Sequence, residues 1–120
     1  MLPDDMDAVF HALAHRDRRR ILDLVGNNPG CCVEDLCPHF DTSRIAVLKH
    51  LRVLERARLL HSVKAGRRRK LFFNVVPIQL IYERWATEYS ALWAGKMSRL
   101  KYRIETQATR EQQPERRRHG

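Results

Sequence analysis

Cationic side chains are concentrated in the middle of the chain, where they could bind an anion. The 120 residues include 23 Lys and Arg against 14 Asp and Glu, a formal net charge of +9. Residues 41–70 hold ten basic and two acidic side chains, whereas residues 1–40 hold four basic and seven acidic ones. A solubilising surface would spread its charge, so this segment is expected to meet an anion. Net charge alone leaves nucleic acid and an anionic membrane surface open.

Three cysteines, Cys31, Cys32 and Cys37, are the residues best suited to metal or redox chemistry. Thiolates prefer soft metal ions, and three sulfurs can hold a trigonal ion. The odd number and the adjacent pair disfavour a disulfide framework and fit a reducing cytoplasm. We favour structural cysteines, with a soft-metal site and a reversible thiol redox switch as the alternatives. No cofactor is expected to be required.

Other chemistry finds no support in the sequence. The six histidines show no metal-ligand spacing, and no residue is placed to orient a Cys–His pair. The five glycines are isolated, so no phosphate-binding loop is expected. No apolar run could span a membrane, and the acidic start Met1–Asp5 is unlike a secretory signal. We expect a cytoplasmic protein that is not an enzyme and has neither a small-molecule substrate nor a membrane partner.

Hydrophobic periodicity predicts a mainly helical chain with one two-stranded hairpin. Helices are expected in five segments: up to Leu13, 17–25 with Asp17 as cap, 33–37, 44–56 with a cap in 41–43, and from Pro77 onward. Two β-favouring runs around Ala65-Gly66 predict the hairpin. We expect one domain over residues 1–107 and a flexible basic tail over 108–120.

The helix expected over 44–56 has two distinct faces at about 100° per residue. The face expected to pack on the core is apolar and holds Val47, His50, Leu51 and Leu54. The opposite face is basic and holds Ile45, Lys49, Arg52 and Arg56, with Arg44 and Leu48 beside them. A short helix, a tight turn and this helix predict a helix-turn-helix, and the hairpin is its wing.

Three segments resemble the ArsR/SmtB family of bacterial transcriptional repressors. The stretch 12–22, ALAHRDRRRIL, resembles the family opening A-L-A-H-P-x-R-x-x-I-L. The stretch 40–55 looks like the family's recognition helix, often written S-R-x-A-V-S-K-H-L-R-V-L-E, and the turn 66–69 is similar to its wing. The resemblance covers about residues 8–104. It implies a winged helix-turn-helix homodimer that represses a promoter by binding a double-stranded DNA operator.

The chain departs from this pattern in places. Arg16 replaces the usual Pro, and Arg58 stands where a Gly commonly ends the recognition helix. The family's C-V-C-D-L-C metal-thiolate motif is matched at Cys32 and Cys37, but its middle cysteine is Glu34 and Cys31 is an extra thiol. Residues 77–107, over which the last helix is expected, contain no His and no Asp, so the family's zinc site on that helix is missing.

The predicted DNA-binding residues come from the helix start, its outward face and the wing. They are Thr42, Ser43, Arg44, Ile45, Leu48, Lys49, Arg52, Lys64, Arg67, Arg68 and Arg69. Hydroxyl groups at the helix start suit phosphate, long cations suit guanine or phosphate, and apolar side chains suit thymine methyls. A cationic hairpin tip suits the backbone or the minor groove. The alternatives are capping alone for Thr42 and Ser43, packing against a neighbouring loop for Ile45 or Leu48, and a solvated hairpin tip.

The resemblance also implies that the first and last helices pair between subunits. The residues expected at this interface are Val9, Phe10, Leu13, Ile81, Trp85, Tyr89, Leu92 and Trp93. Two other functions remain open at this point. One is a basic nucleic-acid binder without sequence preference, which is disfavoured because aromatics are not interleaved with the basic segment. The other is a protein-interaction module whose aromatic C-terminal stripe captures a partner helix.

Overall fold

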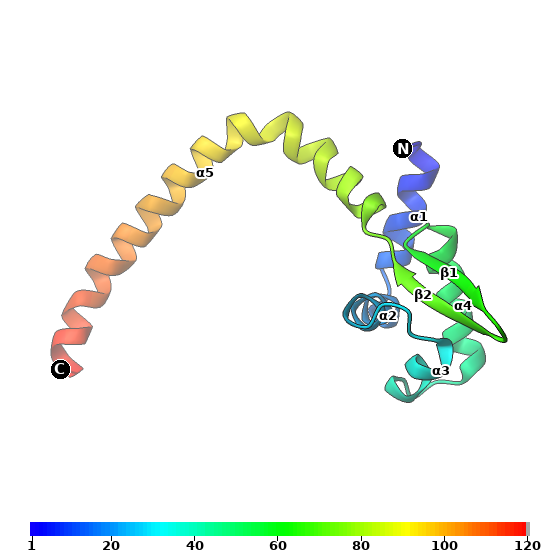
Figure 1. Ribbon diagram of the computed structural model, residues 1–120. Coiled ribbons are helices and arrows are strands. Elements are labelled where there is room, and N and C mark those ends of the chain that lie inside the picture. The colour runs from blue at the N-terminus through cyan, green and yellow to red at the C-terminus, as the bar shows by residue number, and fades with distance from the viewer. Residues whose placement is uncertain (120) are drawn as a thin grey trace. The chain divides into compact units, whose positions relative to one another are not determined.

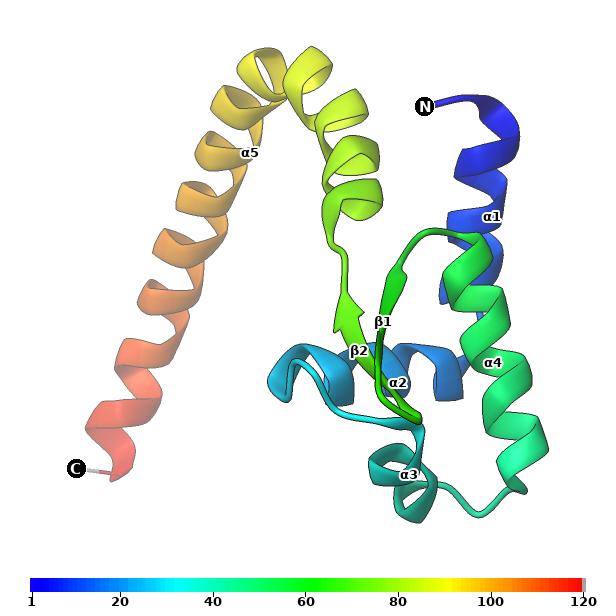
Figure 2. The same cartoon turned by 45° about the vertical axis from the view of Figure 1, so that its right-hand side comes forward.

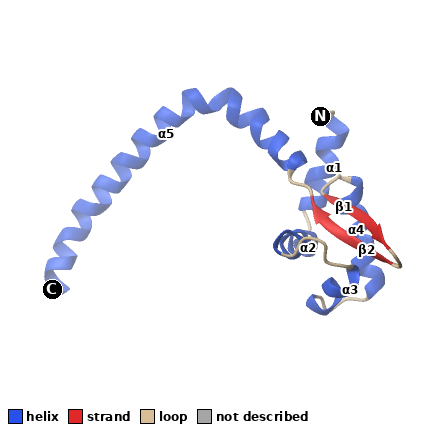
Figure 3. Ribbon diagram, in the orientation of Figure 1, coloured by secondary structure: helices blue, strands red, loops and turns tan. Residues whose placement is uncertain are grey.

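The structure is a computed structural model that describes the backbone of residues 1–119 and the side chains of 1–86 and 95–109. It contains, in order, α1 (Pro3–Leu13), α2 (Arg16–Asn27), α3 (Val33–Leu36), the 3-10 helix η1 (Cys37–His39), α4 (Arg44–Arg56), β1 (Leu60–Ala65), β2 (Arg68–Phe73) and α5 (Val76–His119) (Figures 1 and 3). The chain divides into two units, 1–81 and 82–120. The mainly helical fold with a two-stranded wing is confirmed.

The core of the first unit is built from one face of each helix and the inner side of the hairpin. Its most buried side chains are Val9, Ala12, Ile21, Val25, Leu36, Val47, Leu54, Leu59 and Leu71. These positions recur at helical spacing in α1, α2 and α4, and the apolar stripes of α2 and α4 face the interior. In both views, the hairpin tip lies on the same side of this unit as α3 and the beginning of α4 (Figures 1 and 2).

Two helix starts show how local side chains set the boundaries. Ser43 is the N-cap of α4, and its Oγ accepts a hydrogen bond from the backbone N–H of Ala46 at 3.2 Å, as expected. The expected cap of α2 is wrong: His15 is the N-cap, and its Nδ1 accepts from the N–H of Asp17 at 3.0 Å. Asp17 lies inside the first turn, where a carboxylate is favourable near the positive end of the helix.

Arg58 ends α4 in the left-handed conformation, with φ of 61°. Its N–H donates to the carbonyl of Glu55 at 2.9 Å, and the N–H of Leu59 donates to the carbonyl of Leu54 at 3.0 Å. This pair of bonds is a Schellman motif, which normally places glycine at this position. The side-chain amide of Asn74 then donates to the Arg58 carbonyl at 3.1 Å, so a neighbouring loop also holds the strained residue.

The wing is an antiparallel hairpin in which Leu60 pairs with Phe73 and Ala65 with Arg68. Gly66 has φ of 64° at the first position of the two-residue turn, a value that a primed hairpin turn requires and glycine adopts without strain. Leu71 joins the hairpin to the loop before α3, because its N–H donates to the Cys31 carbonyl at 2.8 Å. The wing is therefore anchored near its base while its tip stays exposed.

The last helix, α5, begins with Pro77 in its first turn. Ile78 and Ile81 pack against the core, whereas Trp85 is exposed. Three of the expected interface residues, Tyr89, Leu92 and Trp93, lie outside the described side chains. In the part of the chain that the structure describes, no helix is long and apolar enough to cross a membrane.

Candidate nucleic-acid interface

The two faces of α4 lie as the sequence predicts. Val47, Leu51 and Leu54 are buried, and His50 is half-buried beside α2. On the opposite side, Arg44, Lys49 and Arg52 are exposed, and Ile45 is 66% exposed. A large apolar side chain at this exposure amid cations is suited to contact an apolar group of a ligand, such as a thymine methyl.

Leu48 behaves differently from Ile45. Its side chain is half-buried and packs against the hydrophobic core. The alternative for one of these two side chains was packing against a neighbouring loop, whereas Leu48 is partly covered by the hydrophobic core. Periodicity placed Leu48 beside the outward face, and only the neighbouring elements decide how much of a flanking position is covered.

The start of α4 provides a second kind of anion site. Thr42 and Ser43 are exposed immediately before the helix. The first N–H groups of a helix have no partner within it and, together with the helix dipole, they favour an anion. Ser43 caps one of these groups, so its hydroxyl also has a structural role. Capping and phosphate binding are compatible here, because a hydroxyl can accept one hydrogen bond and donate another.

The wing adds a second cationic surface. Lys64, Arg67, Arg68 and Arg69 are all exposed. Lys64 and Arg69 are direct cross-strand partners, an arrangement of like charges that destabilises a hairpin by itself. The Arg69 guanidinium donates to the Ser62 hydroxyl at 3.4 Å. A polyanion bound at the tip would relieve this repulsion. The like charges are therefore better explained by binding of an anion than by a contribution to the stability of the hairpin.

Sequence reasoning missed a polar junction between α1, α2 and α4. Arg18 is 9% exposed, and it donates from Nε to the Ala12 carbonyl and from Nη2 to the His11 carbonyl, both at 2.9 Å. Its Nη1 lies 3.5 Å from Nδ1 of His50. Because a guanidinium can only donate, this nitrogen of His50 must accept. Periodicity does not distinguish the arginines of α2, although the family pattern quoted above fixes an arginine only at Arg18.

The electrostatics of this junction favour a neutral His50. Burial lowers the pKa of His50, and the neighbouring His15 and Arg18 act in the same direction, whereas Asp17 opposes them. The two imidazole rings are 4.5 Å apart between centroids. His50 belongs to the inward side of α4, so its protonation would place a positive charge next to Arg18 at the junction of α1, α2 and α4.

One group of potential metal ligands occurs among the described residues: His15, Asp17 and His50, whose ligand atoms lie within 4.8 Å of one another. However, Nδ1 of each histidine already accepts a hydrogen bond, and the Arg18 cation touches His50. A cation bound through Nδ1 would have to displace these donors, and a cation bound through Nε2 of His50 would still lie close to the charge of Arg18. The geometry therefore favours a hydrogen-bonded junction over a metal centre.

The three cysteines do not form a comparable group in the described part of the chain. Cys31 and Cys32 are buried, and Cys37 is half-buried. Burial raises the pKa of the Cys31 thiol, with Asp35 and Cys32 adding to the effect, so this thiol is a poor nucleophile and a poor metal ligand as it stands. The backbone of Cys31 pairs with Leu71, which gives this residue a structural role.

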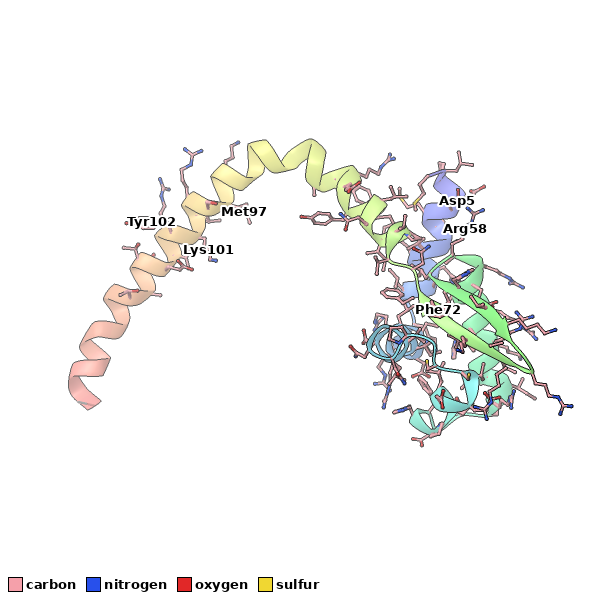
Figure 4. All side chains as sticks on the ribbon, viewed as in Figure 1. Asp5, Arg58, Phe72, Met97, Lys101 and Tyr102 are labelled. Carbon is pink, nitrogen blue, oxygen red and sulfur yellow. The ribbon has the colours of Figure 1, made fainter. Side chains whose placement is uncertain are left out.

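The expected interface residues on α1 and the beginning of α5 fall into two groups. Val9 is 1% exposed, and Leu13 and Ile81 pack against the same core, so these three contribute to the protomer itself. Phe10 and Trp85 are each 47% exposed and are free to meet another surface. A pocket of about 250 Å³ between α1, the end of α4 and the start of α5 is lined by Val9, Arg58, Leu80 and their neighbours. Figure 4 shows Asp5 and Arg58, two of its lining residues, on α1 and at the end of α4.

The chain is similar to known bacterial transcriptional regulators in both sequence and fold. The family described as bacterial regulatory protein, arsR family, matches residues 15–62, which include α2, the helix-turn-helix and the first residues of β1. The uncharacterized HTH-type transcriptional regulator YuzN of Bacillus subtilis (strain 168) is 35% identical over 85 residues, covering 66% of this chain and 92% of that protein.

Two solved structures share the fold over most of the chain. An ArsR family transcriptional regulator superposes with a TM-score of 0.67 at 29% identity, covering 78% of this chain and 95% of the other. An ArsR-like transcriptional regulator from Rhodococcus sp. RHA1 has a TM-score of 0.64 at 26% identity, covering 86% and 93%. These similarities cover more of the chain than the helix-turn-helix alone.

Proposed function

Because the chain belongs to the arsR family of bacterial transcriptional regulators, which are not enzymes, we propose that it is a repressor that binds a promoter operator as a homodimer. The observation that carries the proposal is that the cationic face of α4 and the cationic wing are both exposed. The tip of the wing lies on the same side of the unit as the beginning of α4 (Figure 2). Duplex DNA is the polyanion that fits a helix flanked by such a hairpin.

In the proposed complex, α4 enters the major groove. Arg44, Lys49 and Arg52 contact guanine edges or phosphates, and Ile45 contacts a thymine methyl. Thr42 and Ser43 contact a phosphate at the helix start, and Leu48 supports α4 from its half-buried position. The wing residues Lys64, Arg67, Arg68 and Arg69 contact the backbone or the neighbouring minor groove.

The proposed dimer uses the exposed aromatic residues of α1 and α5. Phe10 and Trp85 supply apolar surface that one protomer leaves uncovered, and Tyr89, Leu92 and Trp93 remain part of the proposal. A two-fold dimer would present two copies of α4 to half-sites about one helical turn of DNA apart. Residues 1–107 form the DNA-binding and dimerisation domain in this proposal, and the protein acts in the cytoplasm. The tail expected over 108–120 is basic, but it is not separate from the last helix, because α5 continues to His119.

DNA binding itself requires no cofactor in this proposal. A soft metal or an oxidant acting on Cys31, Cys32 and Cys37 remains an alternative to purely structural cysteines. In the described conformation these thiols do not converge, so either signal would have to rearrange the segment around α3.

The test begins with selection of bound duplexes from a random library, followed by gel-shift titrations of an enriched duplex and its scrambled counterpart. If the dimer neutralises about 6–10 phosphates, affinity should fall by roughly 10³- to 10⁵-fold between 50 and 200 mM salt. A selection that enriches no sequence would contradict operator binding. Affinity that is insensitive to salt would contradict the assigned cationic surface.

A further inference from the structure

An ion pair joins the two helices of the helix-turn-helix at the proposed DNA surface. Glu34 lies in α3, and Arg44 is the first residue of α4. One guanidinium nitrogen, Nη2, lies 3.3 Å from Oε1 of Glu34, and the two side chains are 61% and 50% exposed, respectively. The charged groups therefore meet in solvent, where a DNA phosphate or base could also reach Arg44.

Glu34 places a negative charge at a surface that is otherwise mainly basic. Residues 41–70, which supply α4 and the wing, contain ten basic side chains and only two acidic ones, Asp41 and Glu55. Glu34 comes from the acidic N-terminal part of the chain, and the fold brings it against the first residue of α4. An exposed ion pair contributes little to stability, so the effect of Glu34 is expected on binding rather than on folding.

The two targets available to Arg44 respond differently to a nearby carboxylate. A phosphate that accepts from Arg44 would carry its own negative charge close to Glu34, and the two anions would repel each other. A guanine edge is neutral, and an arginine has five donors, so Arg44 could contact O6 and N7 while it remains paired with Glu34. The ion pair would also restrict the rotamers of Arg44 before DNA arrives, which reduces the ordering cost of a base contact.

We infer that Glu34 is a specificity-determining residue that directs Arg44 to base edges and weakens binding through phosphate alone. This inference rests on the proposed DNA-binding function. Without Glu34, Arg44 would be free to serve as one more phosphate contact on any sequence.

The test compares Glu34→Gln with wild type on the enriched duplex and on its scrambled counterpart. We expect affinity for the scrambled duplex to rise about 3- to 10-fold at low salt, and its salt dependence to steepen by about 0.9 per added phosphate contact and protomer. Affinity for the enriched duplex should rise less or fall. The ratio of the two affinities should therefore decrease at least about 3-fold, because phosphate contacts carry no sequence information.

Asp23→Asn is the matched control, because Asp23 is exposed on α2 and its substitution changes the net charge equally. We expect it to leave the affinity ratio unchanged. Glu34→Gln in an Arg44→Gln background should also have no effect on the ratio, since the effect of Glu34 acts through Arg44. Thermal melts of each variant establish that the proteins compared are folded.

An unchanged ratio in folded Glu34→Gln would overturn the inference and leave the proposed function standing. An equal change in Asp23→Asn would also overturn it, by showing that net charge is responsible. A wild-type protein with no preference for any duplex would refute the proposed function and this inference together.

Discussion

Arg58 is the residue at which a single substitution should make this protein more stable. It has φ of 61° at the end of α4, where the Schellman motif requires a left-handed residue. For residues with a Cβ this conformation costs about 1–2 kcal/mol, whereas glycine adopts it without strain. Glycine also adds roughly 0.5–1 kcal/mol of unfolded-state entropy, which offsets part of the gain. We expect Arg58→Gly to raise the free energy of unfolding by about 0.5–1 kcal/mol.

Thermal unfolding followed by circular dichroism measures this change. In a folded unit of this size, such a gain raises Tm by about 2–8 °C. Arg58→Ala is the matched control, because it removes the same side chain but keeps the Cβ, and its Tm should stay near that of wild type. Protein concentration must be equal across variants, since association also shifts Tm. Equal Tm values for the Gly and Ala variants would refute the argument from backbone strain.

Three further perturbations test the site and its surroundings. If Arg52 contacts a base, Arg52→Ala should weaken binding to the enriched duplex by about 1–3 kcal/mol more than binding to the scrambled duplex. If gel shifts show equal losses of affinity for the two duplexes, Arg52 contacts a phosphate instead. Because burial and Arg18 lower the pKa of His50 in the folded state, the unfolded chain binds more protons below about pH 6.5. The free energy of unfolding should therefore decrease as the pH falls from that value, and His50→Gln should flatten this part of the urea-melt profile. If Cys31, Cys32 and Cys37 are structural, titration with a soft metal should leave the affinity for DNA unchanged. Substitution of all three by Ser should also leave that affinity unchanged. A metal-dependent loss of affinity that the Ser substitutions abolish would instead establish a thiolate sensor.

The helix-turn-helix could be predicted because its signals are local. Alternation of apolar and basic residues at helical spacing defined the buried and exposed faces of α4, and the cap expected within 41–43 marked its start. The hairpin followed from two β-favouring runs around Gly66. The departure from glycine at Arg58 was also visible in the sequence, although the structure shows how the chain accommodates it.

Positions at the edge of a stripe could not be assigned in the same way. Val9 and Phe10 are neighbours in one predicted interface, yet Val9 is buried in the protomer core and Phe10 is exposed. Leu48 was expected on the DNA face, and it packs partly on the core. Periodicity gives the direction of a side chain, whereas its burial depends on which distant segments pack over it.

By itself, the sequence determined the order of the elements, the concentration of positive charge in residues 41–70 and the family resemblance, because each depends on residues close together in the chain. Only the tertiary structure showed that Arg18 is buried and holds α1 against α2 and α4. It also paired Glu34 with Arg44 across the helix-turn-helix. Both contacts join different helices, and their partners are set by how those helices pack.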